Sequence, residues 1–175
     1  MNLMIKNPRI QSSILTDRLT LEILKVNDYD FILAIVNSKG WIENIGDRNI
    51  HSKDEAIEYI NKILWTENFI YWVVRIKKAK TPIGIISLIK RSYLDYFDIG
   101  FAFLPQYTNY GYAYEAAKAV LKMISRLPDF KIILATTLSS NKSSIKLLTK
   151  LGFRFEKENE TENQKMHIYT NAPKP

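Results

Sequence analysis

Hydrophobic and polar residues alternate in several short stretches of this chain, a pattern typical of strands with one buried face. In the first such stretch, Leu19, Leu21 and Ile23 alternate with polar neighbours. Later stretches are rich in the β-branched and aromatic residues that strands favour. The pattern predicts strands over residues 15–24, 69–76, 83–89, 93–103, 132–136, 153–155 and 166–169.

Apolar residues recur every three or four positions in four other stretches, which is typical of helices with one buried face. Ser52 and Glu55 have the spacing of a capping box, in which each side chain bonds a backbone N–H of the first turn. Asn141 is a good cap for the last helix, and Gly152 suits the left-handed residue that closes it. The pattern predicts helices over residues 29–37, 52–65, 112–127 and 141–151.

Three segments fall outside these regular patterns. Residues 1–13 carry little pattern, and we expect a loose N-terminal arm. Gly40 is expected to end the first helix, and residues 41–50, rich in Asn, Gly and Asp, are predicted to form a loop. Gly84 interrupts a strand, where glycine often marks a bulge.

The order of the predicted elements is β-α-α-β-β-β-α-β-α-β-β. Short links join the three strands between residues 69 and 103, so we predict an antiparallel meander there. Strand–helix–strand crossovers follow. The sequence therefore predicts an α/β (α+β) fold with a mixed sheet covered by helices on both faces. The length of 175 residues suits a single domain over residues 1–175.

Composition excludes several kinds of chemistry. The chain has no cysteine, which excludes disulfides, thiolate metal sites and a cysteine nucleophile. It has only two histidines, His51 and His167, so we expect no metal site. No apolar run is long enough for a membrane helix, and no signal peptide is visible, so we expect a cytoplasmic location and no membrane partner.

The formal net charge is +7, from 25 basic and 18 acidic residues. A basic chain is either simply soluble or attracted to a polyanion such as a nucleotide, a nucleic acid or an acidic partner. The charges are scattered along the chain, and this leaves both readings open. Most of the aromatic residues fall in strand patterns, where core packing explains them, so we do not expect a nucleic acid partner.

The segment from Pro105 to Glu115 joins a predicted strand to a predicted helix and contains small residues where the helix begins. A helix N-terminus has unpaired N–H groups and a partial positive charge, so it can hold a phosphate. Gly111 and Ala113 would let a diphosphate approach the backbone, and Asn109 tolerates the left-handed conformation of tight loops. The alternative is an ordinary strand-to-helix turn.

A second helix start follows the strand at residues 132–136. Asn141 lies at the predicted cap, and Ser144 follows one turn later on the same face. Alone, Asn141 is explained by capping and Ser144 by a surface position. If the two preceding strands are neighbours in the sheet, a ligand could lie between the two helix N-termini.

Four motifs carry a resemblance to a known family. They are Trp-Ile-x-x-Ile-Gly-Asp-Arg at residues 41–48, the loop at residues 108–113, Glu115-Ala116, and Asn141-x-x-Ser144 followed by Lys150-x-Gly152-Phe153. With these motifs the chain resembles the GNAT superfamily of acyl-CoA N-acetyltransferases, in particular the branch that contains RimJ and RimL. The resemblance covers roughly residues 16–155. No single motif is decisive, but four in register are fairly specific.

The resemblance implies a mostly antiparallel sheet of six to seven strands that splays between the fourth and fifth, here after Leu104 and before residues 132–136. The pantetheine arm of acetyl-CoA would pair with the backbone of Phe101 and Phe103. The pyrophosphate of the cofactor would bind the loop at residues 108–113. The implied cofactor-binding residues are Phe101, Phe103, Thr108, Asn109, Tyr110, Gly111, Tyr112, Ala113, Asn141 and Ser144. Thr108 departs from the large polar residue usual in the family.

The implied reaction is acetyl transfer from acetyl-CoA to a primary amine by direct attack. Leu148 occupies the position of the tyrosine that often protonates the leaving thiolate, so Ser144 is the candidate acid or a binding group near the sulfur. Asp98 and Glu43 are candidate bases; Asp98 is alternatively a solvent-facing strand residue. Lys118, Lys142 and Lys146 could approach the CoA phosphates or be surface residues.

The acceptor remains open between a protein N-terminal amine, possible for a ribosomal protein partner, and a small-molecule amine. Two other functions also remain: a non-catalytic acyl-CoA-binding relative, and a basic RNA-associated protein with the same fold. The sequence does not decide between a monomer and a homodimer.

Overall fold

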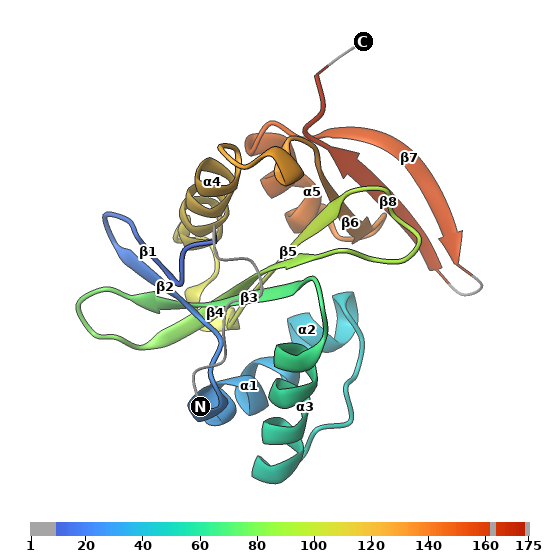
Figure 1. Cartoon of the computed structure of the whole chain (residues 1–175). Coiled ribbons are helices and arrows are strands. Elements are labelled where there is room, and N and C mark those ends of the chain that lie inside the picture. The colour runs from blue at the N-terminus through green and yellow to red at the C-terminus, as the bar shows by residue number, and fades with distance from the viewer. Residues whose placement is uncertain (1–9, 162–163, 174–175) are drawn as a thin grey trace.

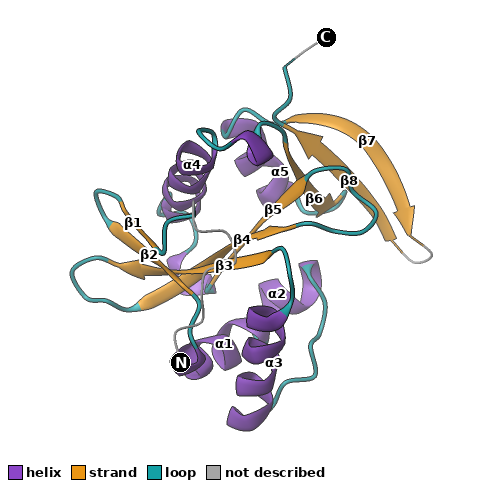
Figure 2. Cartoon of the chain, in the orientation of Figure 1, coloured by secondary structure: helices purple, strands orange, loops and turns teal. Residues whose placement is uncertain are grey.

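A computed structural model describes residues 10–161 and 164–173 and contains one twisted sheet of eight strands (Figures 1 and 2). The strand order is β1-β2-β3-β4-β5-β6-β8-β7, and every neighbouring pair is antiparallel except β5 and β6. The strands are β1 (Ser13–Leu15), β2 (Leu19–Ile23), β3 (Phe69–Ile76), β4 (Pro82–Ile89), β5 (Phe97–Phe103), β6 (Ile133–Leu138), β7 (Arg154–Thr161) and β8 (Gln164–Thr170). This confirms the mixed, mostly antiparallel sheet, with one strand more than the six to seven expected.

The extra strand, β1, overlaps both the expected loose arm, which included Ser13, and the start of the strand predicted over residues 15–24, which is interrupted between Leu15 and Leu19. Residues 1–9 lie outside the described residues. For residues 10–13 the prediction is wrong, because Ile10 is buried and Ser13 pairs with Glu22 of β2. The indole N–H of Trp72 also donates to the Gln11 carbonyl at 3.2 Å. One buried side chain and an edge pairing order this segment without any periodic pattern.

Helices cover both faces of the sheet, as predicted (Figure 2). They are α1 (Tyr29–Val36), α2 (Lys39–Asn44), α3 (Lys53–Trp65), α4 (Tyr112–Ile124) and α5 (Lys142–Lys150). Short 3-10 turns span Val26–Asp28, Pro105–Tyr107 and Pro128–Phe130. The capping box of α3 is confirmed, because Ser52 accepts from the Glu55 N–H and the Glu55 carboxylate accepts from the Ser52 N–H.

The loop predicted at residues 41–50 is partly wrong. Residues 39–44 form α2, so Gly40 lies inside this helix and does not end α1. The indole of Trp41 is 95% removed from solvent and packs with α1 and α3 in the second core. This burial stabilises a short helix that local composition does not favour.

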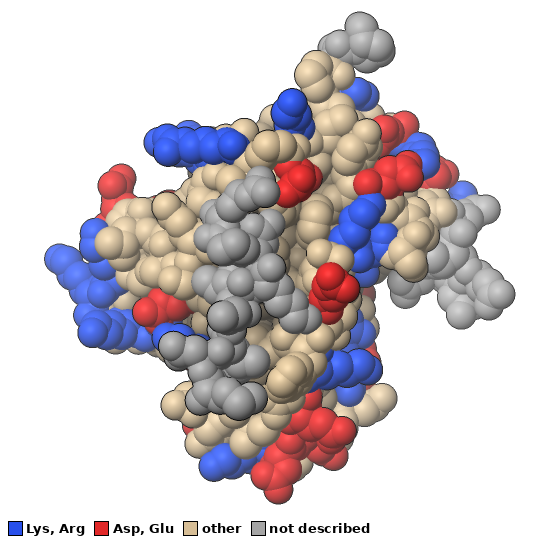
Figure 3. Space-filling view, in the orientation of Figure 1, with Lys and Arg blue, Asp and Glu red and all other residues tan. Residues whose placement is uncertain are grey.

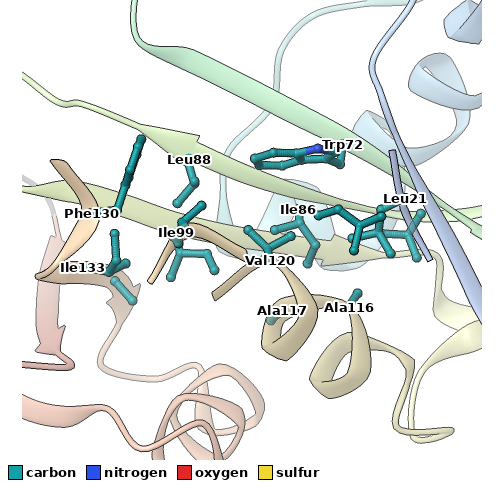
Figure 4. Close-up of a cluster of buried hydrophobic side chains, with 14 of the residues drawn as sticks. Leu21, Trp72, Ile86, Leu88, Ile99, Ala116, Ala117, Val120, Phe130 and Ile133 are labelled. Carbon is teal, nitrogen blue, oxygen red and sulfur yellow. The ribbon is translucent and has the colours of Figure 1, made fainter. Parts of the chain in front are cut away.

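Small side chains bring α4 close to the sheet. Ala116, Ala117 and Val120 are fully buried and face side chains from four strands (Figure 4). These sheet residues are Leu21, Trp72, Ile86, Leu88 and Ile99. Close-packed interiors tolerate little change in volume, so this contact fixes the position of α4 and of the loop that precedes it.

A bulge confirms the interpretation of Gly84. Val74 pairs with Gly84 and Arg75 with Pro82, which leaves Ile83 as the extra residue on β4. A Cβ atom on Gly84 would lie 2.4 Å from the ring of Phe103, so the ring can pack here only against a glycine. The bulge therefore helps to position the end of β5.

Charged side chains are distributed unevenly over the face seen in Figure 3. Lys and Arg gather at the tip of the β3–β4 hairpin, at the left of the view, where Lys77, Lys78 and Lys80 are exposed. Acidic side chains gather over α3 at the bottom. In the part of the chain that the structure describes, no helix combines the length and apolar character needed to cross a membrane.

Candidate active site

The parallel pairing between β5 and β6 stops after two residues. Phe97 pairs with Ile133 and Asp98 with Leu134, and the described residues form no further pair between these strands. We call this point the fork. Beyond it, residues 100–104 are half-buried although β5 lies in the middle of the sheet. The splay predicted between these two strands is therefore confirmed.

The backbone of β5 beyond the fork presents unpaired groups to the gap. The Leu104 N–H donates to the Ile83 carbonyl of the neighbouring chain segment at 2.9 Å. Antiparallel strands exchange hydrogen bonds at alternate residues, so the even-numbered residues of β5 bond to β4. The Ile99 carbonyl and the N–H and C=O groups of Phe101 and Phe103 therefore face the gap, where an extended ligand can add as a strand.

Two helix N-termini lie at the same edge of the sheet as this gap. Helix α4 follows β5 in the chain and α5 follows β6, and the two strands are parallel. The helices contact each other on one side of the sheet (Figure 1). Helix N-termini at the carboxyl ends of parallel strands favour phosphate groups.

The loop before α4 has the backbone conformation expected of a tight turn. Asn109 has φ +66° and Gly111 has φ +79°, both in the left-handed region, as predicted for Asn109. Gly111 is exposed and forms the N-terminal boundary of α4. The Thr108 hydroxyl donates to the Pro105 carbonyl at 2.8 Å, so this smaller residue supports the loop from within. Tyr110 and Tyr112 stack on each other with ring centroids 5.8 Å apart.

Arg18 holds this loop, and sequence reasoning missed it. Its Nε donates to Glu115 Oε2 at 2.7 Å, and its Nη1 donates to the Tyr110 carbonyl at 3.0 Å. The guanidinium lies 4.6 Å from the centre of the Tyr112 ring. Its Nη2 would be 3.6 Å from a Cβ atom on Gly111. We call this set of contacts the clamp; it joins the start of β2 to the loop.

Glu115 receives further hydrogen bonds within the clamp. Its Oε1 accepts from the Thr16 hydroxyl at 2.6 Å and from the Arg18 N–H at 3.0 Å. Burial alone would raise the pKa of Glu115, but these hydrogen bonds and the Arg18 charge outweigh burial and lower it. The Glu115-Ala116 motif was visible in the sequence, but nothing there marked which of the basic residues pairs with it.

Asp98 lies at the fork and is not solvent-facing, which corrects one of the two sequence-based alternatives. Its side chain is 2% exposed. Oδ2 accepts from Arg91 Nε at 2.6 Å, and Oδ1 accepts from the Thr136 N–H at 2.8 Å. The Thr136 hydroxyl is 3.1 Å from both oxygens. Burial raises the pKa of Asp98, and the contacts with Arg91 and Thr136 oppose this rise.

Asn141 and Ser144 are arranged as the sequence predicted. The Ser144 N–H donates to Asn141 Oδ1 at 3.0 Å, so Asn141 caps α5. Ser144 is half-buried in the first turn of α5, at the same edge of the sheet as Gly111. Leu148 is buried in the core one turn further along.

Glu43 lies on α2, and its position corrects the expectation that it belongs to a loop. Its carboxylate is 57% exposed and lies 3.7 Å from Lys39 Nζ, which forms a surface pair one helical turn away. Lys118 and Lys150 both lie over the ring of Tyr114, at 5.4 and 4.5 Å from its centre. Lys142 and Lys146 are exposed on α5.

Several polar side chains gather on the α1–α3 side of the sheet near the fork. Tyr71 of β3 pairs with Ser87, which in turn pairs with Gly100 of β5. Burial raises the pKa of Tyr71, and the nearby charges of Arg91 and Arg48 oppose this rise. These groups lie beside the half-buried Gly100, where a Cβ atom would be 2.6 Å from the Ser87 hydroxyl.

The comparisons with known proteins agree with this geometry. The model of the acetyltransferase (GNAT) domain matches residues 18–154, which is more than half of the chain. This chain belongs to the acetyltransferase (GNAT) domain family. Among curated proteins, it is 27% identical over 143 residues to the uncharacterized N-acetyltransferase YnaD of Bacillus subtilis, covering 82% of this chain and 83% of YnaD.

Solved GNAT structures share the fold. A GNAT-family acetyltransferase from Bacillus anthracis superimposes with a TM-score of 0.74 at 23% identity, over 90% of this chain and 96% of that one. RimL, a ribosomal alpha-N-protein acetyltransferase in complex with coenzyme A, has a TM-score of 0.79 at 13% identity, again over 90% and 96%.

Proposed function

We propose that this protein is an acetyl-CoA-dependent N-acetyltransferase that transfers an acetyl group to a primary amine. One observation carries the proposal: beyond Asp98, β5 has no strand partner on its β6 side, and this side lies beside two helix N-termini at the same sheet edge. An acyl-pantetheine chain needs backbone partners along its length, and a diphosphate needs N–H donors at its end. The two features lie next to each other along the chain, which favours one ligand for both.

The residues at this site would bind the cofactor through backbone N–H and C=O groups, without charged side chains around its diphosphate. Gly111 is exposed, has left-handed backbone and carries no side chain that would cover the first N–H groups of α4. The N–H and C=O groups of Phe101 and Phe103 would pair with the pantetheine amides. An N–H of this strand would also polarise the thioester carbonyl and stabilise the oxyanion that develops during attack.

The acceptor amine would attack the thioester directly. Attack requires a neutral amine, and the departing thiolate requires a proton or a hydrogen bond. Ser144, in the first turn of α5, is our candidate for contact with the sulfur. Asp98 and Glu43 were the candidate bases; Glu43 is held in a surface pair, and the role of Asp98 is considered below.

We place the acceptor among protein N-terminal amines and small-molecule amines. The motifs at residues 41–48 and 141–153 support a position in the branch that contains RimJ and RimL, whose members include acetyltransferases of ribosomal proteins. A ribosomal protein is therefore the first macromolecular acceptor to test.

The test has two stages. In the first, unfolding is followed by temperature with and without millimolar acetyl-CoA; saturation to about 100 times the dissociation constant stabilises the folded state by about 2.7 kcal/mol. In the second, a panel of peptides and amines is incubated with acetyl-CoA, and the released thiol is measured. An unchanged melting temperature would contradict the proposal. Stabilisation without thiol release on any acceptor would instead support a non-catalytic acyl-CoA-binding relative.

A further inference from the structure

At the fork, a side chain replaces the backbone acceptor that would make the next hydrogen bond between β5 and β6. Asn171 donates its N–H to the Ile133 carbonyl, and Ser139 donates to the Lys165 carbonyl. The odd-numbered residues of β6 therefore bond to β8, and the Thr136 N–H points toward β5. In the register set by the Asp98–Leu134 pair, this N–H would bond the Ile99 carbonyl if the strands continued together.

Instead, the Thr136 N–H donates to Oδ1 of Asp98 at 2.8 Å. The carboxylate thus satisfies the first β6 donor beyond the fork, and the Ile99 carbonyl is left free. Without this carboxylate, the buried Thr136 N–H would lack a hydrogen-bond partner, which would destabilise the folded protein, or β5 and β6 would form one more backbone hydrogen bond. A side chain that replaces a ladder bond ends the ladder at a defined residue.

We infer that Asp98 is a positioning residue that sets where β5 and β6 separate, and thereby where the thioester-binding edge of β5 begins. The inference rests on the proposed function for its second half. Its first half, the control of the fork, stands on the hydrogen bonds alone. Arg91 completes the arrangement, because its guanidinium pairs with the carboxylate oxygen that Thr136 N–H does not use.

The same contacts make Asp98 unsuited to the role of general base. A base must accept a proton directly or through one water, and so needs a free lone pair that substrate or solvent can reach. Both carboxylate oxygens of Asp98 already accept hydrogen bonds from Arg91 and Thr136, and the side chain is 2% exposed. Its surroundings are those of a structural ion pair.

Two substitutions distinguish a positioning role of Asp98 from a general-base role. Asp98→Asn removes the basic carboxylate, and Asp98→Glu retains it but displaces it. Asp98→Asn keeps an oxygen at the Oδ1 position for the Thr136 N–H, but it loses the Oδ2 acceptor of Arg91 and cannot act as a base. Asp98→Glu keeps a basic carboxylate but moves it by one methylene group. If Asp98 positions the fork, the Asn variant retains acetyl-CoA affinity within about threefold, and the Glu variant loses about tenfold or more, because small displacements of a bound reactant are expensive.

If Asp98 is the base, the order is reversed. The Asn variant then loses about a hundredfold or more in kcat at unchanged acetyl-CoA affinity, and the acidic limb of its pH–rate profile disappears. Retention of that limb in Asp98→Asn supports positioning. A Glu variant that is more active than the Asn variant would overturn the inference while leaving the proposed function intact.

A measurement that needs no turnover tests the fork itself. Amide hydrogen exchange at Thr136 should be faster in Asp98→Ala than in wild type, by at least tenfold beyond the change at Val120 in the same core. Ile60→Val, a conservative change in the second core, controls for lost stability. If Asp98→Ala increases the exchange rates of the Thr136 and Val120 amides equally, the inference is overturned, whether or not acetyl-CoA binds. If acetyl-CoA does not stabilise the wild-type protein, this result counts against the proposed function alone.

Discussion

Arg18 and Glu115 lie 97 residues apart in the chain, yet their side chains form a 2.7 Å ion pair. The pair joins the start of β2 to the first turn of α4, and Arg18 also holds the Tyr110 carbonyl of the preceding loop. The loop is thus fixed from outside by contacts with Arg18. Because Glu115 neutralises the charge of Arg18, the clamp contributes to the candidate diphosphate site mainly by fixing the conformation of the loop, and little by its charge.

Loss of the clamp should weaken cofactor binding more than stability. Arg18 is half exposed, and exposed ion pairs contribute about 0–1 kcal/mol, so Arg18→Gln should lower the unfolding free energy by about 1 kcal/mol or less. Its acetyl-CoA dissociation constant should rise about tenfold, because the loop must then be ordered on binding. Calorimetric titration checks this. The control is Lys39→Gln, which breaks the surface pair with Glu43 and should leave cofactor affinity unchanged.

Stability should depend on pH through Glu115. Its pKa is lower in the folded protein than the ordinary value of 4.5, so its contribution is present above that value and is lost as pH falls through the folded-state pKa. We expect the stability difference between wild type and Glu115→Gln to be constant near neutral pH and to shrink below about pH 4.5. Urea unfolding of both proteins between neutral and acidic pH measures it. A difference that grows on acidification would contradict the assigned direction.

Gly111 and Gly152 form a matched pair for testing the loop. Both have left-handed backbone, with φ +79° and +89°, and both lie at a helix boundary, but Gly152 follows α5 and is distant in sequence from the loop. Valine at either position should cost about 1–3 kcal/mol of stability through backbone strain. Only Gly111→Val should also lose the acetyl-CoA-dependent rise in melting temperature. A full rise in Gly111→Val would mean that the diphosphate binds elsewhere.

Ser144 and its neighbour Ser143 provide another comparison. Ser143 is exposed on α5, whereas Ser144 is half-buried in the first turn. If Ser144 is a binding group near the sulfur, Ser144→Ala should raise the KM for acetyl-CoA about three- to tenfold with kcat nearly unchanged, since a lost hydrogen bond to a ligand costs about 1 kcal/mol. Ser143→Ala should change neither. A fall in kcat alone would identify Ser144 as the proton donor.

The charges near the fork should disfavour cationic acceptors. Arg48 and Arg91 both lie near Tyr71, and so does the carboxylate of Asp98. The charges near Tyr71 thus include two guanidinium groups and one carboxylate, which is already paired with Arg91. Among three-carbon amines, we expect kcat/KM to fall from β-alanine to its amide to 1,3-diaminopropane. Arg48→Gln should reduce this preference about five- to tenfold, and Lys62→Gln, on the outer part of α3, should not.

Much of the fold could be predicted because it depends on local pattern. The period of apolar residues identified α1, α3, α4 and α5, and alternation together with β-branched and aromatic content identified seven of the eight strands. Turn chemistry predicted the left-handed Asn109, and the cap at Asn141 was visible from residue type. Helix α2 was missed, because it depends on burial of Trp41 by α1 and α3, which no short window of sequence contains.

The candidate site divides in the same way. The sequence by itself determined the glycine-containing turn before α4 and the cap of α5, because a chain segment carries its own conformational preferences; the role of the Phe101 and Phe103 backbone was implied only by the family resemblance. Only the tertiary structure decided that Asp98 is buried against Thr136 and that Arg18 holds the loop through Glu115. Such contacts join residues far apart in the chain, and a carboxylate becomes a ladder partner or a surface charge only through the strand that packs beside it.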